Sequence, residues 1–487
     1  MFEILKDGDV EILAEGVFEV LGRLGMICEN REILKALEDS GATVLLEEQR
    51  ARFPRSVVER FVAETRKEEH AKREIGGENK KTLNSGYVPA VSAPARFEAP
   101  YVPYIFHPLA VFFYDEETGE KRRGVQDDFI RLTKLGDVLH SQMGVGHSLI
   151  LSDVPAAIEP LQAALLLLQY AHRPRGVYVQ DVRQIDYLLE IEEVAGIEDP
   201  YWHWLANVSF ATPLKLGKDI ADRFAHMVKT GLYPAKVYSM AVSGVSTPVT
   251  VGGTTVLTAA ELIALWICAR ALDSSVPLTG MALVGTMDMR TGEVNYGTFD
   301  ALIRRLSACE FVRKWTGVPV SPGVGEYTSS RTPGLYTALE KAYVAMTIAA
   351  FTGHHPEVGI GHLEAGLAIS PVQFMLDREI TEGLRFLESP TIDEDSLGVE
   401  TILQVGFGQE MNYAETQHTL EHFKASIWAP EFFDRTGWSL ESEAEALNKA
   451  REKVRQALEV YEKPEVDPEV IAGVEEVIAK AGKEFLQ

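Results

Sequence analysis

From about residue 125 onward, short apolar runs rich in β-branched residues alternate with longer amphipathic stretches. The expected strand runs are 148–152, 176–180, 205–210, 235–242, 277–284, 318–324 and 357–360, and the clearest helical stretches are 126–142, 158–172, 258–272 and 335–351. Repeated alternation of this kind is typical of parallel strands joined by crossover helices. About seven or eight units over roughly 250 residues favour an α/β fold with a closed (β/α)8 TIM-type barrel.

A doubly wound open sheet is the alternative architecture for the same alternation. Such sheets commonly bind nucleotides through a glycine-rich loop that opens a helix. The sequence has no GxGxxG or GxxxxGK[ST] motif at the start of a helical stretch. This absence counts against a nucleotide-binding fold and leaves the barrel as the favoured prediction.

The regions flanking the predicted barrel have helical patterns. Apolar residues recur at helical spacing from Val10 to Leu24, and a second amphipathic stretch begins at Pro54. After about Ile380 the chain becomes helical and acidic, with a long amphipathic helix expected over Ser439 to Tyr461. We therefore divide the chain into an N-terminal helical segment, a barrel and a C-terminal helical extension, over residues 1–80, 81–380 and 381–487.

The net charge of −25 bears on possible partners. An acidic surface repels nucleic acid and anionic membranes, so neither is an expected partner. Cys28, Cys268 and Cys309 form no CxxC pair, which predicts neither a disulfide framework nor a cysteine-rich zinc site. The N-terminus does not resemble a signal peptide, and the longest apolar runs are too short to span a bilayer. We expect a cytoplasmic enzyme.

Functional side chains in such a barrel gather where the strands end. Polar residues and glycines follow several of the apolar runs directly, and the candidates that they supply are Ser243, Asp288, Glu326, Tyr327, Arg331 and His362. Trp202 and Trp204 precede the 205–210 run. Asp288 has a second interpretation, in which it only caps a turn. Glu326 is the most suggestive acid, because carboxylates are rarely buried in a core without a function.

Metal binding is weighed separately because histidines cluster late in the chain. His418 and His422 are four residues apart on one expected helix face, as in some zinc enzymes, but the sequence between them does not make HExxH. We therefore predict no metal site. A barrel hydrolase or lyase that uses His354, His362 and Asp288 around a divalent metal is the rival hypothesis.

Several motifs occur in one order along nearly the whole chain: 115–123, 152–155, 211–214, 241–250, 287–292, 366–370, 417–423 and 428–435. The last two read QHTLEHF and WAPEFFDR. In this order and spacing the set resembles the trimethylamine:corrinoid methyltransferase family. The founding members of that family carry pyrrolysine, whereas this chain has only ordinary residues between Val318 and Arg331. It is therefore similar to the branch that lacks pyrrolysine, which includes demethylases of glycine betaine.

The resemblance implies a methyltransferase that moves a methyl group from a small quaternary amine to the Co(I) corrinoid of a partner protein. Cobalamin would then be carried by that corrinoid protein, and no cofactor would be bound directly. Aromatic faces and a carboxylate hold a trimethylammonium group best. This implies a cage from Trp202, Trp204 and Tyr327, with Glu326 or Asp288 as the catalytic counter-charge. Ser243 is a further substrate-binding candidate.

If the methyl donor is a betaine, its carboxylate needs a cation, for which Arg331 or His362 is the candidate. A non-catalytic protein that only binds a quaternary amine is a further alternative, since the nucleophile belongs to the partner. We also expect a homo-oligomer, because the helical C-terminal extension carries apolar stripes that need cover.

Overall fold

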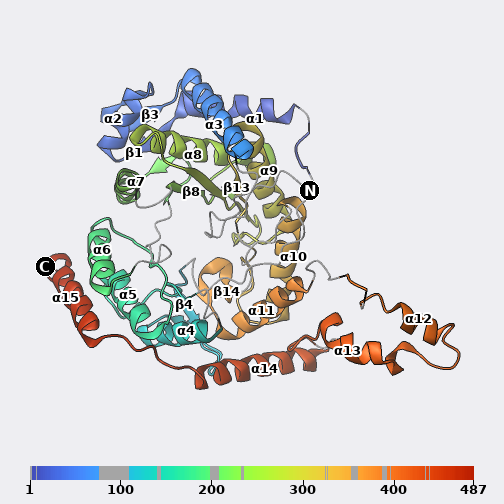
Figure 1. Ribbon diagram of the computed structural model, residues 1–487. Coiled ribbons are helices and arrows are strands. Elements are labelled where there is room, and N and C mark those ends of the chain that lie inside the picture. The colour runs from blue at the N-terminus through green and yellow to red at the C-terminus, as the bar shows by residue number, and fades with distance from the viewer. Residues whose placement is uncertain are drawn as a thin grey trace.

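A computed structural model gives the arrangement of the elements (Figure 1). It describes residues 3–6, 8–75, 109–139, 144–197, 208–231, 235–323, 325, 327–352, 360–386, 392–394, 396–433, 435–437 and 439–486. The fold mixes helices with several small sheets. This agrees with the predicted α/β class.

Four strands form the central parallel sheet, in the order β13-β10-β8-β6. They are β6 (Val208–Ser209), β8 (Ala235–Ser239), β10 (Leu278–Ala282) and β13 (Val320–Ser321). Each lies within an apolar run that the sequence marks as a strand. The β8–β10 register joins Ala235 to Leu278 and Ser239 to Ala282. All pairings in this sheet are parallel, as the crossover pattern predicts.

Helices surround the strands in chain order (Figure 1). They are α4 (Gln126–Leu139), α5 (Glu159–Tyr170), α6 (Arg183–Ala195), α7 (Lys218–Thr230), α8 (Val251–Leu272), α9 (Phe299–Thr316), α10 (Leu335–Thr352) and α11 (Pro371–Arg385). The predicted bounds of α4, α5 and α10 agree with the observed ones to within about three residues. Helix α8 begins seven residues before its predicted start at 258, because Thr250 caps it by accepting a hydrogen bond from the Gly253 amide.

Helix α8 is buried without interruption from Thr258 to Ala269. Its middle is lined by apolar side chains on every face, including Trp266 and Leu262. Among the described residues, α8 alone is long and apolar enough to cross a membrane, but 78% of its apolar window is buried inside the protein. A helix that is hydrophobic all round and covered in this way is a core helix.

The N-terminal region contains α1 (Asp9–Glu19), a π-helical turn η1 (Val20–Leu24), α2 (Arg31–Asp39), a 3-10 turn η2 (Leu46–Glu48) and α3 (Arg55–Ile75), with β1 (Met26–Cys28), β2 (Thr43–Leu45) and β3 (Arg50–Arg52) between them. The helices agree with the predicted helical segment, but the strands were not expected. Each strand has three residues, which is too short for an alternating pattern to show in the sequence. β1 also pairs in parallel with β7 (Lys215–Leu216), which joins this region to the central body.

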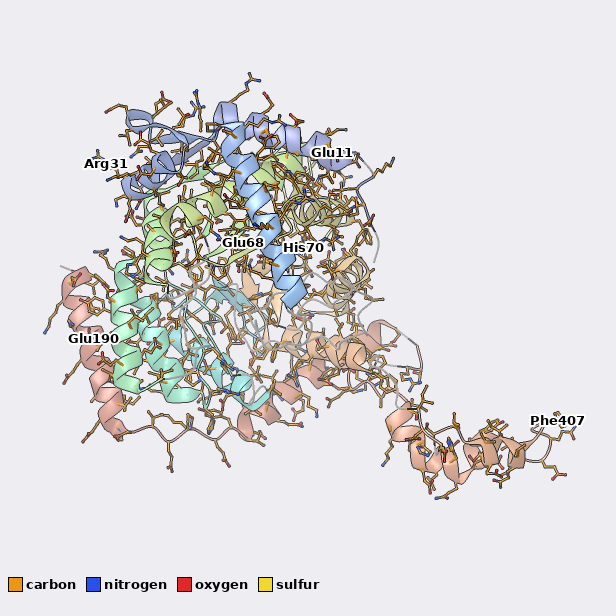
Figure 2. All side chains as sticks on the ribbon, turned by 45° about the horizontal axis from the view of Figure 1, so that its top comes forward. Glu11, Arg31, Glu68, His70, Glu190 and Phe407 are labelled. Carbon is orange, nitrogen blue, oxygen red and sulfur yellow. The ribbon has the colours of Figure 1, made fainter. Side chains whose placement is uncertain are left out.

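Helix α3 lies across α9, with Glu68 and His70 near its C-terminal end (Figure 2). Glu68 forms an ion pair with Arg270 of α8 at 2.7 Å. This contact fixes α3 against the helices that surround the central strands.

Two further small sheets complete the described strands. One contains β9 (Val242–Ser243), β11 (Gly285–Met287) and β12 (Val294–Asn295), and the other contains β4 (Phe112–Tyr114), β5 (Lys121–Arg123), β14 (His362–Leu363) and β15 (Ala368–Ile369), with a 3-10 turn η3 (Glu364–Gly366) before β15. β4 and β5 form a hairpin around the turn predicted at 115–119. β4 pairs in parallel with β15, so the start and the end of the central region lie side by side.

The described residues that follow α11 are mainly helical. They contain α12 (Val399–Val405), a 3-10 turn η4 (Tyr413–Glu415), α13 (Gln417–Ser426), α14 (Leu440–Glu459) and α15 (Pro468–Phe485). Helix α14 packs on α4 and α11, and α15 packs on α5 and α6. In contrast, the segment from 392 to 427, here called the arm, projects away from the ring of helices with Phe407 at its tip (Figure 2).

Candidate functional site

The loops that follow β8 and β10 are joined to one another by a small sheet. β9 follows β8 and β11 follows β10, and these two pair in parallel with Thr286 opposite Ser243. β12 then pairs antiparallel to β11, so residues 285–295 form a hairpin beyond the end of β10. Because the carboxyl ends of parallel strands meet at one edge of a sheet, this hairpin lies where barrel enzymes place their sites.

Ser243 is buried and its hydroxyl is fully engaged within the protein. It accepts hydrogen bonds from Arg304 Nε at 2.9 Å and Thr254 Oγ1 at 3.2 Å, and it donates to the Val249 carbonyl at 3.2 Å. A hydroxyl offers one donor and two acceptor positions, so these partners fill its capacity. Ser243 therefore fixes the loop between β9 and α8, and its contact with a substrate stays a prediction.

Asp288 lies at the turn of the hairpin. Its carboxylate accepts hydrogen bonds from the backbone and the side chain of Arg290, at 2.8 and 3.3 Å through Oδ1. The hydrogen bond from the Arg290 side chain holds the pKa of Asp288 below its usual range. Asp288 is therefore ionised at neutral pH and braces the turn, which is the alternative that the sequence left open for it. Its role as a counter-charge stays a prediction.

Two tyrosine rings face each other between the hairpin and the segment after β13. Tyr327 is buried and lies 5.7 Å from Tyr296, measured between ring centroids, with 45° between the ring planes. A Cβ atom on Gly285 would lie 2.8 Å from the Tyr296 ring, so the ring can occupy this place only over a glycine. Tyr327 was a predicted site residue, and Tyr296 was missed because it follows no long apolar run.

The segment 328–330 is held by a buried carboxylate. Glu340 of α10 accepts hydrogen bonds from the Thr328 hydroxyl and from the Ser329 amide, the latter at 3.0 Å. The Ser329 hydroxyl in turn donates to Asn295 of the hairpin. These contacts place the chain after Tyr327 firmly against the hairpin that carries Tyr296.

The turn after β14 closes onto the same segment. The Glu364 amide donates to the Ser330 carbonyl at 2.9 Å, and the Ala365 amide donates to the Thr328 carbonyl at 2.7 Å. Both Glu364 and Ala365 have a left-handed backbone, with φ of 50° and 54°. Non-glycine residues hold this conformation only where surrounding contacts enforce it, and such strain is concentrated at functional sites. His362, which is buried in β14, lies two residues before this turn.

Arg331 extends into solvent at the edge of this region. It forms an ion pair with Glu293 of the hairpin at 2.7 Å, and its side chain is 68% exposed. The structure thus brings Ser243, Asp288, Tyr327, Arg331 and His362 onto segments that contact one another. The other candidates, Trp202, Trp204 and Glu326, lie outside the described residues.

Arg305 is a charged residue of this region that the sequence analysis missed. It comes from the N-terminal half of α9, and its side chain is completely buried. Its Nη2 donates to the Tyr296 carbonyl at 2.7 Å. Burial lowers its pKa to about 10, so the guanidinium remains charged at neutral pH.

Within the described part of the chain, no group of three or more His, Cys, Asp or Glu side chains is arranged to hold a metal ion. His418 and His422 are neighbours, with ring centroids 4.5 Å apart, but they belong to α13 of the arm, away from the hairpin and the tyrosine pair. The rival hypothesis of a metal-dependent hydrolase uses His354, His362 and Asp288 instead, and it stays untested because His354 lies outside the described residues.

Comparison with known proteins bears on the chemistry. The profile of the family described as Trimethylamine methyltransferase (MTTB) matches residues 1–485. The glycine betaine methyltransferase of Desulfitobacterium hafniense (strain Y51) is 24% identical over 500 residues, which cover 99% of this chain and 98% of that protein. The trimethylamine methyltransferase of D. hafniense (strain DSM 10664 / DCB-2) is 21% identical over 96% of this chain and 91% of its own length. The trimethylamine methyltransferase MttB2 of Methanosarcina mazei is 24% identical over 56% of this chain and 55% of its own length.

Proposed function

The chain belongs to the trimethylamine methyltransferase family, and we propose that it transfers a methyl group from a small quaternary amine, of the glycine betaine type, to the Co(I) corrinoid of a partner protein. The observation that carries this proposal is the family match over residues 1–485, together with a glycine betaine methyltransferase that aligns along nearly the whole chain. Formation of methylcobalamin from glycine betaine and Co(I) cobalamin, followed by visible absorbance, tests it.

The chemistry of this reaction suits a site without an internal nucleophile. A methyl carbon on a quaternary nitrogen is electrophilic, because its C–N electron pair leaves with a neutral tertiary amine. The Co(I) centre of the second substrate supplies the electron pair of the new Co–CH3 bond, so the balance needs no further oxidant, acid or base. The tasks left to this chain are orientation and exclusion of water.

The described residues offer a surface suited to a trimethylammonium group. Tyr327, which is buried, and Tyr296, which is partly buried, present two aromatic rings at the carboxyl end of the central strands. Aromatic faces attract such cations, most strongly where water is excluded. We propose that Trp202, Trp204 and Tyr327 form the cage, that Glu326 and Asp288 supply negative charge, and that Ser243, Arg331 and His362 line the remainder.

We further propose that the central region is a closed (β/α)8 barrel over residues 81–380, between the helical segments 1–80 and 381–487. Parallel bridges between Ala110 and Leu149 and between Val145 and Pro174 support further parallel strands in the part of the chain before β6. The parallel pairing of β15 with β4 brings the last strand beside the first. The helices that surround the strands in Figure 1 also support the proposed barrel.

Glu326→Gln is expected to weaken binding of a trimethylammonium ligand about 10-fold, because one ionic contact of this kind contributes about 1–2 kcal/mol. Titration calorimetry with glycine betaine measures the change. Glu475→Gln on the exposed face of α15 removes the same charge away from the site and should leave the affinity unchanged. Equal affinity of the Glu326 variant and the wild type would remove Glu326 from the site.

The corrinoid is a second substrate in this proposal, carried by a separate protein, and no cofactor bound directly by this chain is required. We propose a cytoplasmic location, since Co(I) is a strong reductant that needs a reducing compartment and the three cysteines are all unpaired and buried.

The arm suggests that the protein is a homo-oligomer. Its apolar side chains are widely exposed, including Leu403 and Phe407. Helix α10 carries a second exposed apolar stripe, formed by Tyr336, Leu339 and Met346, next to α11, from which the arm continues. Two apolar surfaces on one chain can cover each other reciprocally in a twofold dimer, so we propose that the arm of one copy lies on α10 of another.

This arrangement predicts that Leu403→Glu/Phe407→Glu yields monomers. A charge placed in an apolar interface loses its hydration without gaining a partner. Light scattering should show an oligomer for the wild type and for Ile12→Glu, an exposed position on α1, and a monomer for the double variant. A wild-type protein that is monomeric at micromolar concentration would contradict the proposed oligomer.

A further inference from the structure

Arg305 is the most deeply buried cation in the candidate site, and most of its hydrogen-bonding capacity is unused. Nη2 donates to the Tyr296 carbonyl, but Nε and Nη1 have no partner. Among the described residues, no carboxylate forms an ion pair with this guanidinium. A buried charge in this state is costly, so it requires an explanation other than stability.

The guanidinium lies at the carboxyl end of the parallel sheet, between β10 and β13. A Cβ built on Gly323, two residues after β13, would lie 3.9 Å from Arg305 Nη1 and 3.2 Å from Leu283, which follows β10. Gly280 of β10 faces Trp266 of α8, so by strand alternation the next residue, Met281, faces the opposite, inner side of the sheet. The Sδ atom of Met281 would lie 3.7 Å from a Cβ atom on Gly323. Arg305 therefore reaches from α9 toward the inner side of the strands.

The neighbours of Arg305 fit one kind of ligand. Its Nη2 donates to the carbonyl of Tyr296, whose ring lies 5.7 Å from that of Tyr327, measured between ring centroids. A guanidinium binds a carboxylate through two parallel N–H donors, and aromatic faces bind an ammonium group. The two halves of a small zwitterion with a carboxylate and a trimethylammonium group would thus meet matching chemistry in one place.

We propose that Arg305 binds the carboxylate of the methyl donor, so that the substrate class is the quaternary ammonium carboxylates and not simple methylated amines or amino alcohols. This inference rests on the proposed methyl transfer from a quaternary amine. Arg305 replaces Arg331 as the residue that binds the carboxylate, because Arg331 is largely exposed and already paired with Glu293. Arg305 then acts as the residue that determines specificity for the acid.

Three trimethylammonium probes test this assignment by titration calorimetry: glycine betaine, choline and tetramethylammonium. The first carries a carboxylate and the others do not. The wild type should bind glycine betaine at least 10-fold more tightly than choline. Arg305→Met should lower the affinity for glycine betaine about 10- to 100-fold, as expected for hydrogen bonds to a charged group, and should leave choline unchanged.

The matched control is Arg313→Gln, which removes a positive charge from the same helix about 12 Å further along its axis. It should leave the preference for glycine betaine unchanged. Because Arg305→Met removes a poorly paired buried charge at similar volume, its melting temperature should not fall by more than a few degrees. A purely structural arginine would instead lower the melting temperature and weaken all probes alike.

If the methionine variant does not fold, Arg305→Lys is titrated with the same three probes instead. It keeps the charge but loses the two-pronged geometry, so glycine betaine binding should fall about 10-fold with choline unaffected. A variant at position 305 that folds and still prefers glycine betaine would overturn the assignment, as would a wild type that binds choline as tightly. If the wild type binds none of the probes, the proposed function itself is contradicted.

Discussion

Lys341→Met is expected to lower the free energy of unfolding by about 3–5 kcal/mol, because it leaves a buried carboxylate without its partner. Lys341 of α10 and Asp377 of α11 form an ion pair in which both side chains are completely buried. Asp377 also accepts hydrogen bonds from the Gly361 amide at 3.0 Å and from Gln373 at 2.6 Å. The pair therefore joins two helices to the residue that precedes His362.

Urea unfolding followed by circular dichroism measures this loss. The control is Lys480→Met, which breaks an exposed ion pair with Glu190 between α15 and α6 and should cost less than about 1 kcal/mol. Glu190 is labelled in Figure 2, and α6 and α15 lie side by side in Figure 1. Equal losses in the two variants would mean that the Lys341–Asp377 pair does not stabilise the fold as inferred.

Trp266→Ala is expected to lower the free energy of unfolding by about 3–5 kcal/mol, through lost burial and the cavity that remains. The indole is completely buried, and its Nε1 donates to the Thr279 carbonyl of β10 at 2.9 Å. A Cβ on Gly280 would lie 2.9 Å from the ring, so the indole packs directly on the backbone of the strand. Its removal should therefore loosen the contact between α8 and β10.

Ile12→Ala on α1 provides the control, because Ile12 is 72% exposed and its truncation should change stability by no more than about 0.5 kcal/mol. Both variants can be compared in one series of urea titrations. A Trp266 variant as stable as the Ile12 variant would contradict the view that α8 is the core helix on which the central sheet is packed.

Much of the central region could be predicted from periodicity alone. Helices α4, α5 and α10 have long repeats at helical spacing, and β8, β10 and β13 fall within apolar runs. Helix α14 could be placed because Ser439 caps it through the Ser442 amide. The three-residue strands β1 to β3 could not be predicted, because they are defined by pairing with distant segments and not by a local pattern.

The candidate site shows where sequence reasoning fails and why. Asp288 follows an apolar run, but the position of Arg290 two residues later allows it to brace a turn instead. Arg305 was missed because it stands beside Arg304, and a pair of arginines is typical of a solvated helix face. Neighbouring residues on a helix point about 100° apart. The spacing of Arg305 from Leu302, Ala308 and Val312 places it on the buried side of α9, and this signal could have identified it.

The most direct test of the proposed function is methyl transfer from glycine betaine to Co(I) cobalamin by the purified protein. We expect methylcobalamin and the demethylated tertiary amine to form in equal amounts, with no transfer from trimethylamine. Transfer from trimethylamine alone would contradict a quaternary amine as the substrate. Tight binding of glycine betaine without any transfer, even with a reduced corrinoid protein as acceptor, would mean that the chain binds a quaternary amine but is not a methyltransferase.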